Sequence, residues 1–169
     1  MNLRFIGIVM VVTGCGGFGF AMAAAYRREL TLLSRLIRVL NDMEWELQYR
    51  LTPLPELCRM AAREETGILR DVFLRLAQSL DSMRNPDVKS CMQAILSAKQ
   101  IPSILRKHLK ELGTSLGRFD LQGQILGLRA VRASCRKELN ELENRKTERI
   151  KEYRMLALCA GAAIAVLMI

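Results

Sequence analysis

Residues 5–26 read FIGIVMVVTGCGGFGFAMAAAY, a stretch of 22 residues without a charged side chain. As a helix with a rise of about 1.5 Å per residue, this stretch would be roughly 33 Å long, which matches the ~30 Å hydrocarbon core of a bilayer. Arg4 precedes the stretch, and Arg27 and Arg28 follow it. We therefore expect residues 1–26 to form an N-terminal transmembrane segment.

Small residues recur at every fourth position of this stretch. In a membrane, where packing rather than hydrophobicity drives helix association, such a stripe lets a second helix approach closely. We expect the stripe to be a surface for membrane-helix packing; it comprises Thr13, Gly17, Ala21 and Ala25.

Two other interpretations of the stretch remain open. Gly14, Gly16 and Gly19 spell the G-x-G-x-x-G pattern of a dinucleotide-binding turn. That fold needs a second parallel strand one helix later, whereas the residues after Glu29 keep a helical period. The alanines at 23–25 resemble the cleavage region of a signal peptide, but the arginine pair behind them resists translocation.

The charged residues lie between two uncharged segments. Residues 27–154 hold 25 of the 26 Lys and Arg residues and all 17 acidic residues, an excess of eight positive charges. The closing segment, 155–169, has only 15 residues and would span about 22 Å as a helix, so a buried or interfacial helix is its alternative. By the positive-inside rule we expect a cytoplasmic domain at 27–154, a short C-terminal transmembrane segment at 155–169, and both termini outside the cytoplasm.

The basic excess also fits a partner that is anionic. Acidic residues are interspersed among the basic ones, and aromatic residues make up only 5% of the chain, so no basic run carries stacking platforms for bases. We expect no nucleic acid partner. A membrane-tethered basic domain that binds nucleic acid or anionic lipid is kept as an alternative function.

Helical periodicity runs through the whole of 27–154. Apolar residues recur at spacings of three and four over 33–47, so a long first helix should continue from Tyr26 and end at Thr52 and Pro53. Thr52 is then the expected N-cap of a short second helix, with Pro53 at its first helical position.

Glycine and proline divide the remainder. Gly67, the Asn-Pro pair at 85–86 and Pro102 separate a third, a fourth and a fifth helix. Asp120 should cap a last helix that meets no proline before the C-terminus, and Gly127, like Gly123, indicates close packing or a flexible start. We predict an all-α fold of about six helices in which the long first and last helices run antiparallel.

No group of residues suggests catalysis or metal binding. His108 is the only histidine and stands in RKHLKE, so we expect an exposed surface side chain. The cysteines have no metal-ligand spacing, and the three within 27–154 occupy apolar helical positions typical of small core residues. We expect no enzyme, no metal and no cofactor. The five cysteines are Cys15, Cys58, Cys91, Cys135 and Cys159.

Three stretches resemble the stage III sporulation protein AB family of endospore-forming bacteria. The segment EWELQYRLTPL at 44–54 is similar to the family's E-x-E-[IL]-x-Y-x-x-T-P-L element. LGRFDLQGQ at 116–124 is similar to L-G-x-x-D-x-x-x-Q, and KEYR at 151–154 resembles the approach to the family's last apolar segment. Arg50 and Ala157 stand where the family often has glycine.

This resemblance implies a helical cytosolic domain similar to the inner-membrane platform protein of type II secretion systems. It implies a place in the channel complex between mother cell and forespore, on the mother-cell side in the outer forespore membrane. The implied partners are a cytoplasmic ATPase, stage III sporulation protein AA, other membrane proteins of the complex, and membrane lipids. The implied function is that of a non-enzymatic, membrane-anchored adaptor that docks the ATPase.

The far end of the first helix is the candidate partner-binding site. Trp45 and Tyr49 are spaced i and i+4 and so share one helix face, about 38 Å from the start of the helix at the end nearer Leu51. Two hypotheses stay open: these aromatics are core anchors, or they receive the ATPase while neighbouring carboxylates pair with its basic residues. The candidate residues are Glu44, Trp45, Glu46, Tyr49, Thr52 and Pro53.

Overall fold

The computed structural model describes residues 27–82, 87–98, 101–116 and 120–168, with only the backbone described for 145–168. All regular secondary structure in this part of the chain is helical. A first helical segment covers 27–49. It is followed by α2 (Leu54–Glu64), α3 (Ile68–Asp81), α4 (Val88–Ala98), α5 (Ser103–Ser115) and α6 (Leu121–Met168).

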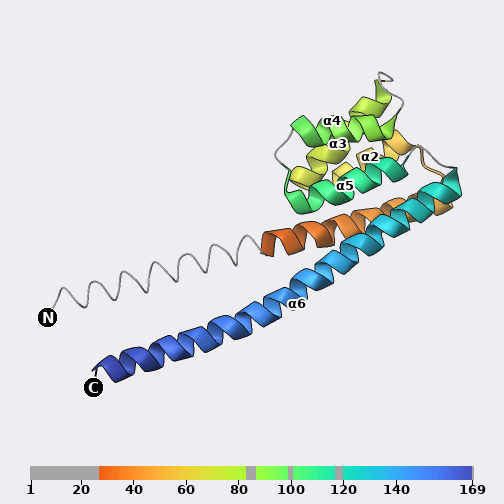
Figure 1. The fold of residues 1–169 in the computed structure, drawn as a ribbon. Helices are drawn as coiled ribbons and strands as arrows, with labels where there is room; N and C mark the ends of the chain where they lie inside the picture. The colour runs from red at the N-terminus through yellow and green to blue at the C-terminus, as the bar shows by residue number, and fades with distance from the viewer. Residues whose placement is uncertain (1–26, 83–86, 99–100, 117–119, 169) are drawn as a thin grey trace.

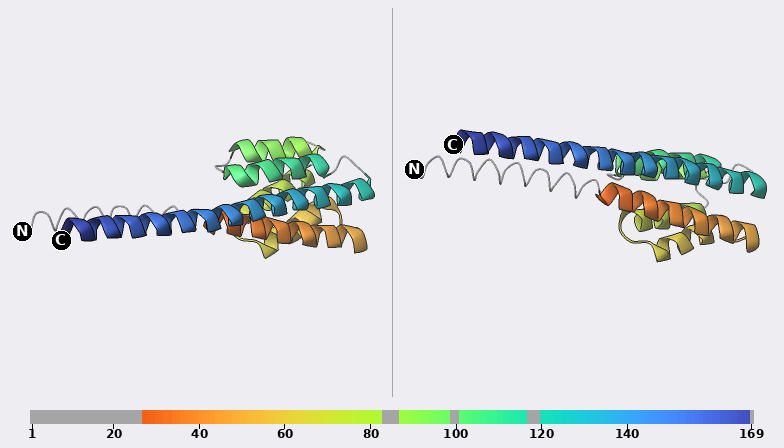
Figure 2. Two further views of the ribbon diagram at one scale, coloured as in Figure 1. Left: turned by 60° about the horizontal axis from the view of Figure 1, so that its bottom comes forward. Right: turned by 90° about the horizontal axis from the view of Figure 1, so that it is seen from below.

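The long helices form an antiparallel hairpin, as predicted. Figures 1 and 2 show α6 running back alongside helix 27–49. The four short helices pack together beside helix 27–49 and the first half of α6. We call the end of the bundle where helix 27–49 ends and α6 begins the tip. The second half of α6 extends beyond the short helices, away from the tip.

The core lies where one apolar face of each helix meets the others. Phe73 at its centre is fully buried, and α5 and α6 contribute leucines, isoleucines and a cysteine at helical spacing. Removing a buried side chain of this size costs about 3–5 kcal/mol, so these faces account for much of the stability of the bundle. The buried residues of the long helices are Leu33, Leu36, Val39, Leu40, Met43, Leu47, Ile125, Leu128, Val131 and Cys135.

The ends of two helices follow the sequence prediction. The Asp120 side chain accepts a hydrogen bond from the Gly123 N–H at 3.0 Å and so caps α6. Gly67 precedes α3 with φ of 67°, a left-handed conformation that glycine adopts at little cost.

Gly127 is needed for a close helix contact. A Cβ atom at this position would lie 2.5 Å from the Cβ of Ser115 on α5. The expectation of close packing at Gly127 is therefore confirmed.

The predicted cap of the second helix is wrong. Pro53 is the N-cap residue of α2, and no side chain caps this helix. The Thr52 hydroxyl instead donates a hydrogen bond to Glu46 Oε2 at 3.0 Å. The carboxylate of the preceding helix therefore competes successfully for the hydroxyl that the sequence pattern assigned to the helix start.

In the described part of the chain, no helix is both long enough and apolar enough to span a membrane. The C-terminal transmembrane segment predicted at 155–169 is thus not supported, although α6 continues through it as far as Met168. The predicted N-terminal segment at 1–26, with its small-residue stripe and its glycine pattern, lies outside the described residues.

Candidate partner-binding site

The two aromatic side chains at the tip are solvent-exposed. Trp45 is 50% exposed and Tyr49 is 65% exposed, with their ring centroids 5.3 Å apart. The Arg50 guanidinium carbon lies 5.5 Å from the centroid of the Trp45 ring, within cation–π range. Leu51 beside them is exposed as well. The hypothesis that Trp45 and Tyr49 are core anchors is therefore wrong.

Glu44, next to Trp45, points in a different direction. The residue is only 8% exposed. It accepts a hydrogen bond from Arg129 Nε at 2.5 Å and pairs with Arg132 Nη1 at 2.6 Å, both on α6. Successive residues of a helix are about 100° apart around its axis, so Trp45 faces solvent while Glu44 faces α6. The expectation that Glu44 is available to a partner is corrected: it ties the two long helices together.

Glu46 organises the turn after the first helix. Its side chain accepts the hydrogen bond from Thr52 and lies 3.4 Å from Arg50 Nη1. Leu51 between them has φ of 55°, a conformation that costs a leucine roughly 1 kcal/mol. Glu46 and Thr52 therefore hold a strained turn at the tip. Of the six candidate residues, Trp45, Tyr49 and Pro53 are exposed.

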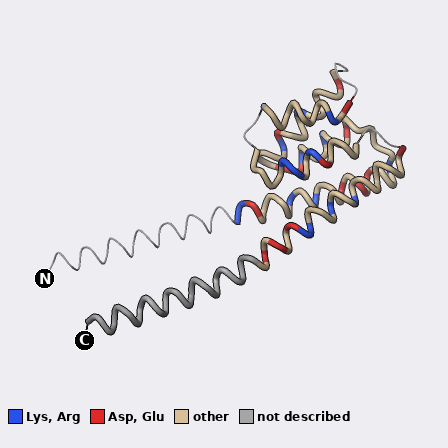
Figure 3. Tube along the Cα trace, viewed as in Figure 1, with Lys and Arg blue, Asp and Glu red and all other residues tan. Residues whose placement is uncertain are grey.

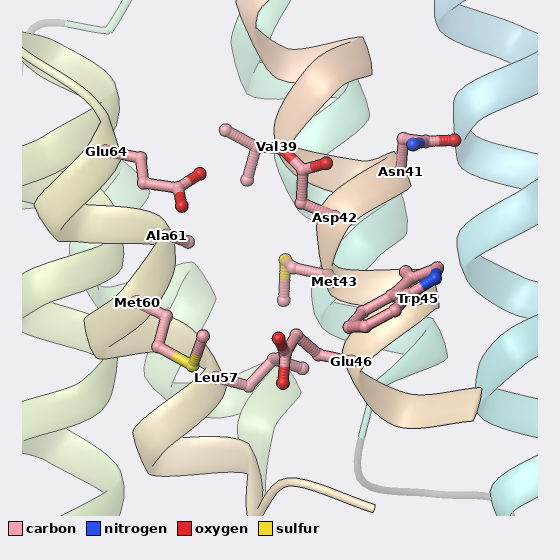
Figure 4. Close-up of a pocket in the computed structure, with 10 residues that line it drawn as sticks. All are labelled: Val39, Asn41, Asp42, Met43, Trp45, Glu46, Leu57, Met60, Ala61 and Glu64. Carbon is pink, nitrogen blue, oxygen red and sulfur yellow. The ribbon is translucent and has the colours of Figure 1, made fainter. Parts of the chain in front are cut away.

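A groove that sequence reasoning missed lies beside Trp45. It has a volume of about 280 Å³ between helix 27–49 and α2. Figure 4 shows Met43 of the first helix and Met60 of α2 facing one another across it. The groove's apolar lining is Val39, Met43, Leu57, Met60 and Ala61.

The rim of this groove is acidic. Asp42 and Glu46 line it from the first helix, and Glu64 lines it from α2. Neither Asp42 nor Glu64 forms an ion pair with any residue the structure describes. Figure 3 shows basic residues at the start of the first helix and acidic residues towards its end. Glu44 and Glu46 are paired with arginines there, so the acidic character belongs to the groove rim at Asp42 and Glu64.

His108 is not the surface residue that its charged neighbours suggested. It is fully buried between α5 and α6, where its Nε2 lies 2.9 Å from Glu138 Oε2. The signal that could have placed it is its spacing: His108 stands between Leu105 and Leu112 on the buried face of α5.

The thiols of the described part are suited to packing and not to nucleophilic chemistry. Cys58, Cys91 and Cys135 are buried, as predicted. Burial raises the pKa of Cys58 to about 12. Burial, together with Glu111 and Glu138, raises the pKa of Cys135 to about 12. Both thiols therefore stay protonated at neutral pH, whereas the thiolate is the reactive form.

No group of three or more His, Cys, Asp and Glu residues in the described ranges lies close enough to hold a metal ion. The described part thus contains a helical hairpin with an exposed aromatic pair and an acid-rimmed groove beside it. It is an all-α helical bundle.

The family follows from comparison with known sequences. The family "Stage III sporulation protein AB" matches residues 4–169, so this chain belongs to that family and has a role in sporulation. It is similar to the stage III sporulation protein AB of Bacillus subtilis (strain 168), with 21% identity over 169 residues, 98% of this chain and 99% of the relative. No solved structure gives a significant match.

Proposed function

We propose that this protein is a non-enzymatic, membrane-anchored adaptor of a transenvelope, secretion-like channel complex in endospore formation, and that its tip docks a cytoplasmic ATPase. The main observation that supports this proposal is the exposed pair of Trp45 and Tyr49 beside an acid-rimmed groove. Tryptophan and tyrosine dominate the energy of many protein interfaces.

The tip is suited to docking because it is fixed before a partner arrives. Glu44 joins the first helix to α6, and the contacts of Glu46 hold the turn that follows. A preorganised surface loses little conformational freedom on binding, so more of the contact energy remains as affinity.

The anchor is assigned to the ends of the chain. The 22 uncharged residues of 5–26 are long enough to cross a bilayer as a helix. The uncharged segment at 155–169, which does not qualify as a membrane span, is proposed to lie at the membrane surface. The stripe from Thr13 to Ala25 is the proposed packing surface of the anchor. The basic excess of 27–154 favours the cytoplasmic side for the domain. The family resemblance implies that this is the mother-cell side.

The identity of the proposed ATPase partner comes from the family resemblance. Stage III sporulation protein AA is the cytoplasmic ATPase that the resemblance implies, and the acidic rim of Asp42 and Glu64 favours basic residues on its docking face. The other membrane proteins of the complex are the remaining partners.

The test is the affinity of the full chain, in mild detergent, for that ATPase. Trp45→Ala with Tyr49→Ala should weaken binding by at least about tenfold, since loss of one interface anchor costs more than about 2 kcal/mol. The melting temperature should stay unchanged because both side chains are exposed.

Leu74→Ala on α3 is the matched control, since Leu74 is also an exposed large apolar residue. It should bind like the wild type. Normal binding by the Trp45→Ala, Tyr49→Ala variant would refute the tip as the dock, and equal weakening by Leu74→Ala would show that the loss is unspecific.

A further inference from the structure

A second hollow, of about 630 Å³, lies at the end of the bundle opposite the tip. Arg28 and Leu32 line it from the start of the first helix, and Pro102 and Arg106 line it from α5 and the residue before it. Figure 1 shows that the first helix and α5 begin at the same end of the bundle.

The walls of this hollow are apolar, and two of its three charged residues, Arg28 and Arg106, have unused hydrogen-bond donors; the third is Glu29. Leu32, Ile68, Ile101 and Pro102 supply the walls. Arg28 and Arg106 form no ion pair with any described residue. The one hydrogen bond of the Arg106 guanidinium in this part is a 3.5 Å contact with the Ile101 carbonyl.

Two helix starts add to the positive potential. α3 begins at Ile68, which lines the hollow, and α5 begins directly after Pro102. Neither helix has a side-chain cap, so the first N–H groups of both lack such a partner. Such N–H groups and the helix dipole favour an anion, and here they supplement the two arginines.

We propose that this hollow binds the headgroup phosphate of an anionic glycerophospholipid from the membrane. The arginines would hold the phosphate by charge-assisted hydrogen bonds, and the apolar walls would cover the glycerol backbone and the beginning of the acyl chains. Glu29, which also lines the hollow, offers an acceptor for a headgroup hydroxyl.

The assignment to lipid rests on the proposed membrane anchoring. Arg28 follows the uncharged stretch 5–26 by two residues, and basic residues next to a membrane helix lie at headgroup level. A free phosphate would use the arginines but would gain nothing from the four apolar residues.

The experiment titrates the full chain in mild detergent with short-chain dihexanoyl phosphatidylglycerol, dihexanoyl phosphatidylcholine and inorganic phosphate. The wild type should bind phosphatidylglycerol at least about tenfold more tightly than phosphatidylcholine, the size of effect expected for charged hydrogen bonds. Arg28→Gln with Arg106→Gln should abolish this preference. Arg75→Gln with Arg136→Gln, which removes two exposed arginines elsewhere, should retain it.

A second variant separates binding from folding. Pro102 occupies the N-cap position of α5, where aspartate is a favourable residue. Pro102→Asp should therefore keep or raise the melting temperature. It should weaken phosphatidylglycerol binding by about tenfold, because its carboxylate would accept hydrogen bonds from the N–H groups of the helix start, which the phosphate would otherwise approach.

Three results would overturn the proposal: the preference survives in Arg28→Gln, Arg106→Gln; both arginine pairs reduce it equally; or inorganic phosphate binds as tightly as phosphatidylglycerol. Carbonate extraction tests the anchoring separately. Release of the wild-type chain from cell membranes by carbonate would refute the anchoring and with it the lipid source, whatever the titrations show.

Discussion

Replacing Glu44 by glutamine should loosen the hairpin of the two long helices. The change keeps the size of the side chain but removes the charge that Arg129 and Arg132 share, and the new amide NH₂ group cannot accept a hydrogen bond. A charge-assisted hydrogen bond contributes about 1.5–3 kcal/mol when it is sheltered from water.

The solvent exposure of the two arginines determines how much stability the change should cost. The Arg129 side chain is 49% exposed, so water can replace Glu44 as its hydrogen-bond partner. The contribution of this pair to the free energy of unfolding therefore falls to about 0.5–1 kcal/mol. The Arg132 side chain is only 23% exposed and keeps its 2.7 Å hydrogen bond to Asn41, so its pairing with Glu44 supplies the larger share. We expect Glu44→Gln to lower the free energy of unfolding by about 2–3 kcal/mol.

The assay is urea unfolding of the full chain in mild detergent, followed by circular dichroism. Glu141→Gln is the control, because Glu141 is an exposed residue of α6, and it should change the free energy of unfolding by less than about 0.5 kcal/mol. In a double-mutant cycle, Glu44→Gln and Arg132→Met should show a coupling energy of about 1–2 kcal/mol. If Glu44→Gln unfolds at the same midpoint as Glu141→Gln, the ion pairs do not hold the hairpin together.

Further predictions concern glycine and cysteine. Gly127→Ala should cost about 1–3 kcal/mol in urea unfolding, because its Cβ would meet Ser115 at 2.5 Å, and Ser115→Gly should restore part of the loss; no rescue would place the strain elsewhere. Gly67→Ala should cost about 1 kcal/mol although no atom lies within 4 Å, because φ there is +67°, and an unchanged midpoint would contradict this. Above the ordinary thiol pKa of 9.0, stability should fall as pH rises, since unfolded Cys58 and Cys135 release protons that the folded chain, with pKa values of about 12, retains. Cys58→Ala with Cys135→Ala should flatten the decline, measured by unfolding at a series of pH values, and an equal slope in that variant would refute the assignment.

Much of the helical architecture is determined locally and could therefore be predicted. The spacing of apolar residues in α3 places Leu69, Val72 and Phe73 on one face, and the structure buries all three. Asp120 caps α6 because the donor it binds lies only three residues away. In such cases the interacting groups are neighbours along the chain, so composition and period contain the needed information.

The place of the candidate residues in the fold could be predicted, but not which of them are exposed. Their position at the end of the first helix follows from the element at 44–54, whereas the exposure of Trp45 and the burial of Glu44 do not. The sequence shows that the two residues are adjacent; it does not show that Arg129, 85 positions later, will lie beside one of them. The burial of His108 could have been predicted from its spacing with Leu105 and Leu112, but its partner Glu138, 30 positions away, could not.

The sequence by itself determined the helices, most of their limits and the face of each that is apolar, because these depend on contacts within a few residues. Only the tertiary structure decided which charged groups are buried, which aromatics remain in solvent, and where the groove and the hollow form. A charged or aromatic residue is stable in either environment according to the partner it meets, and packing of distant helices supplies that partner.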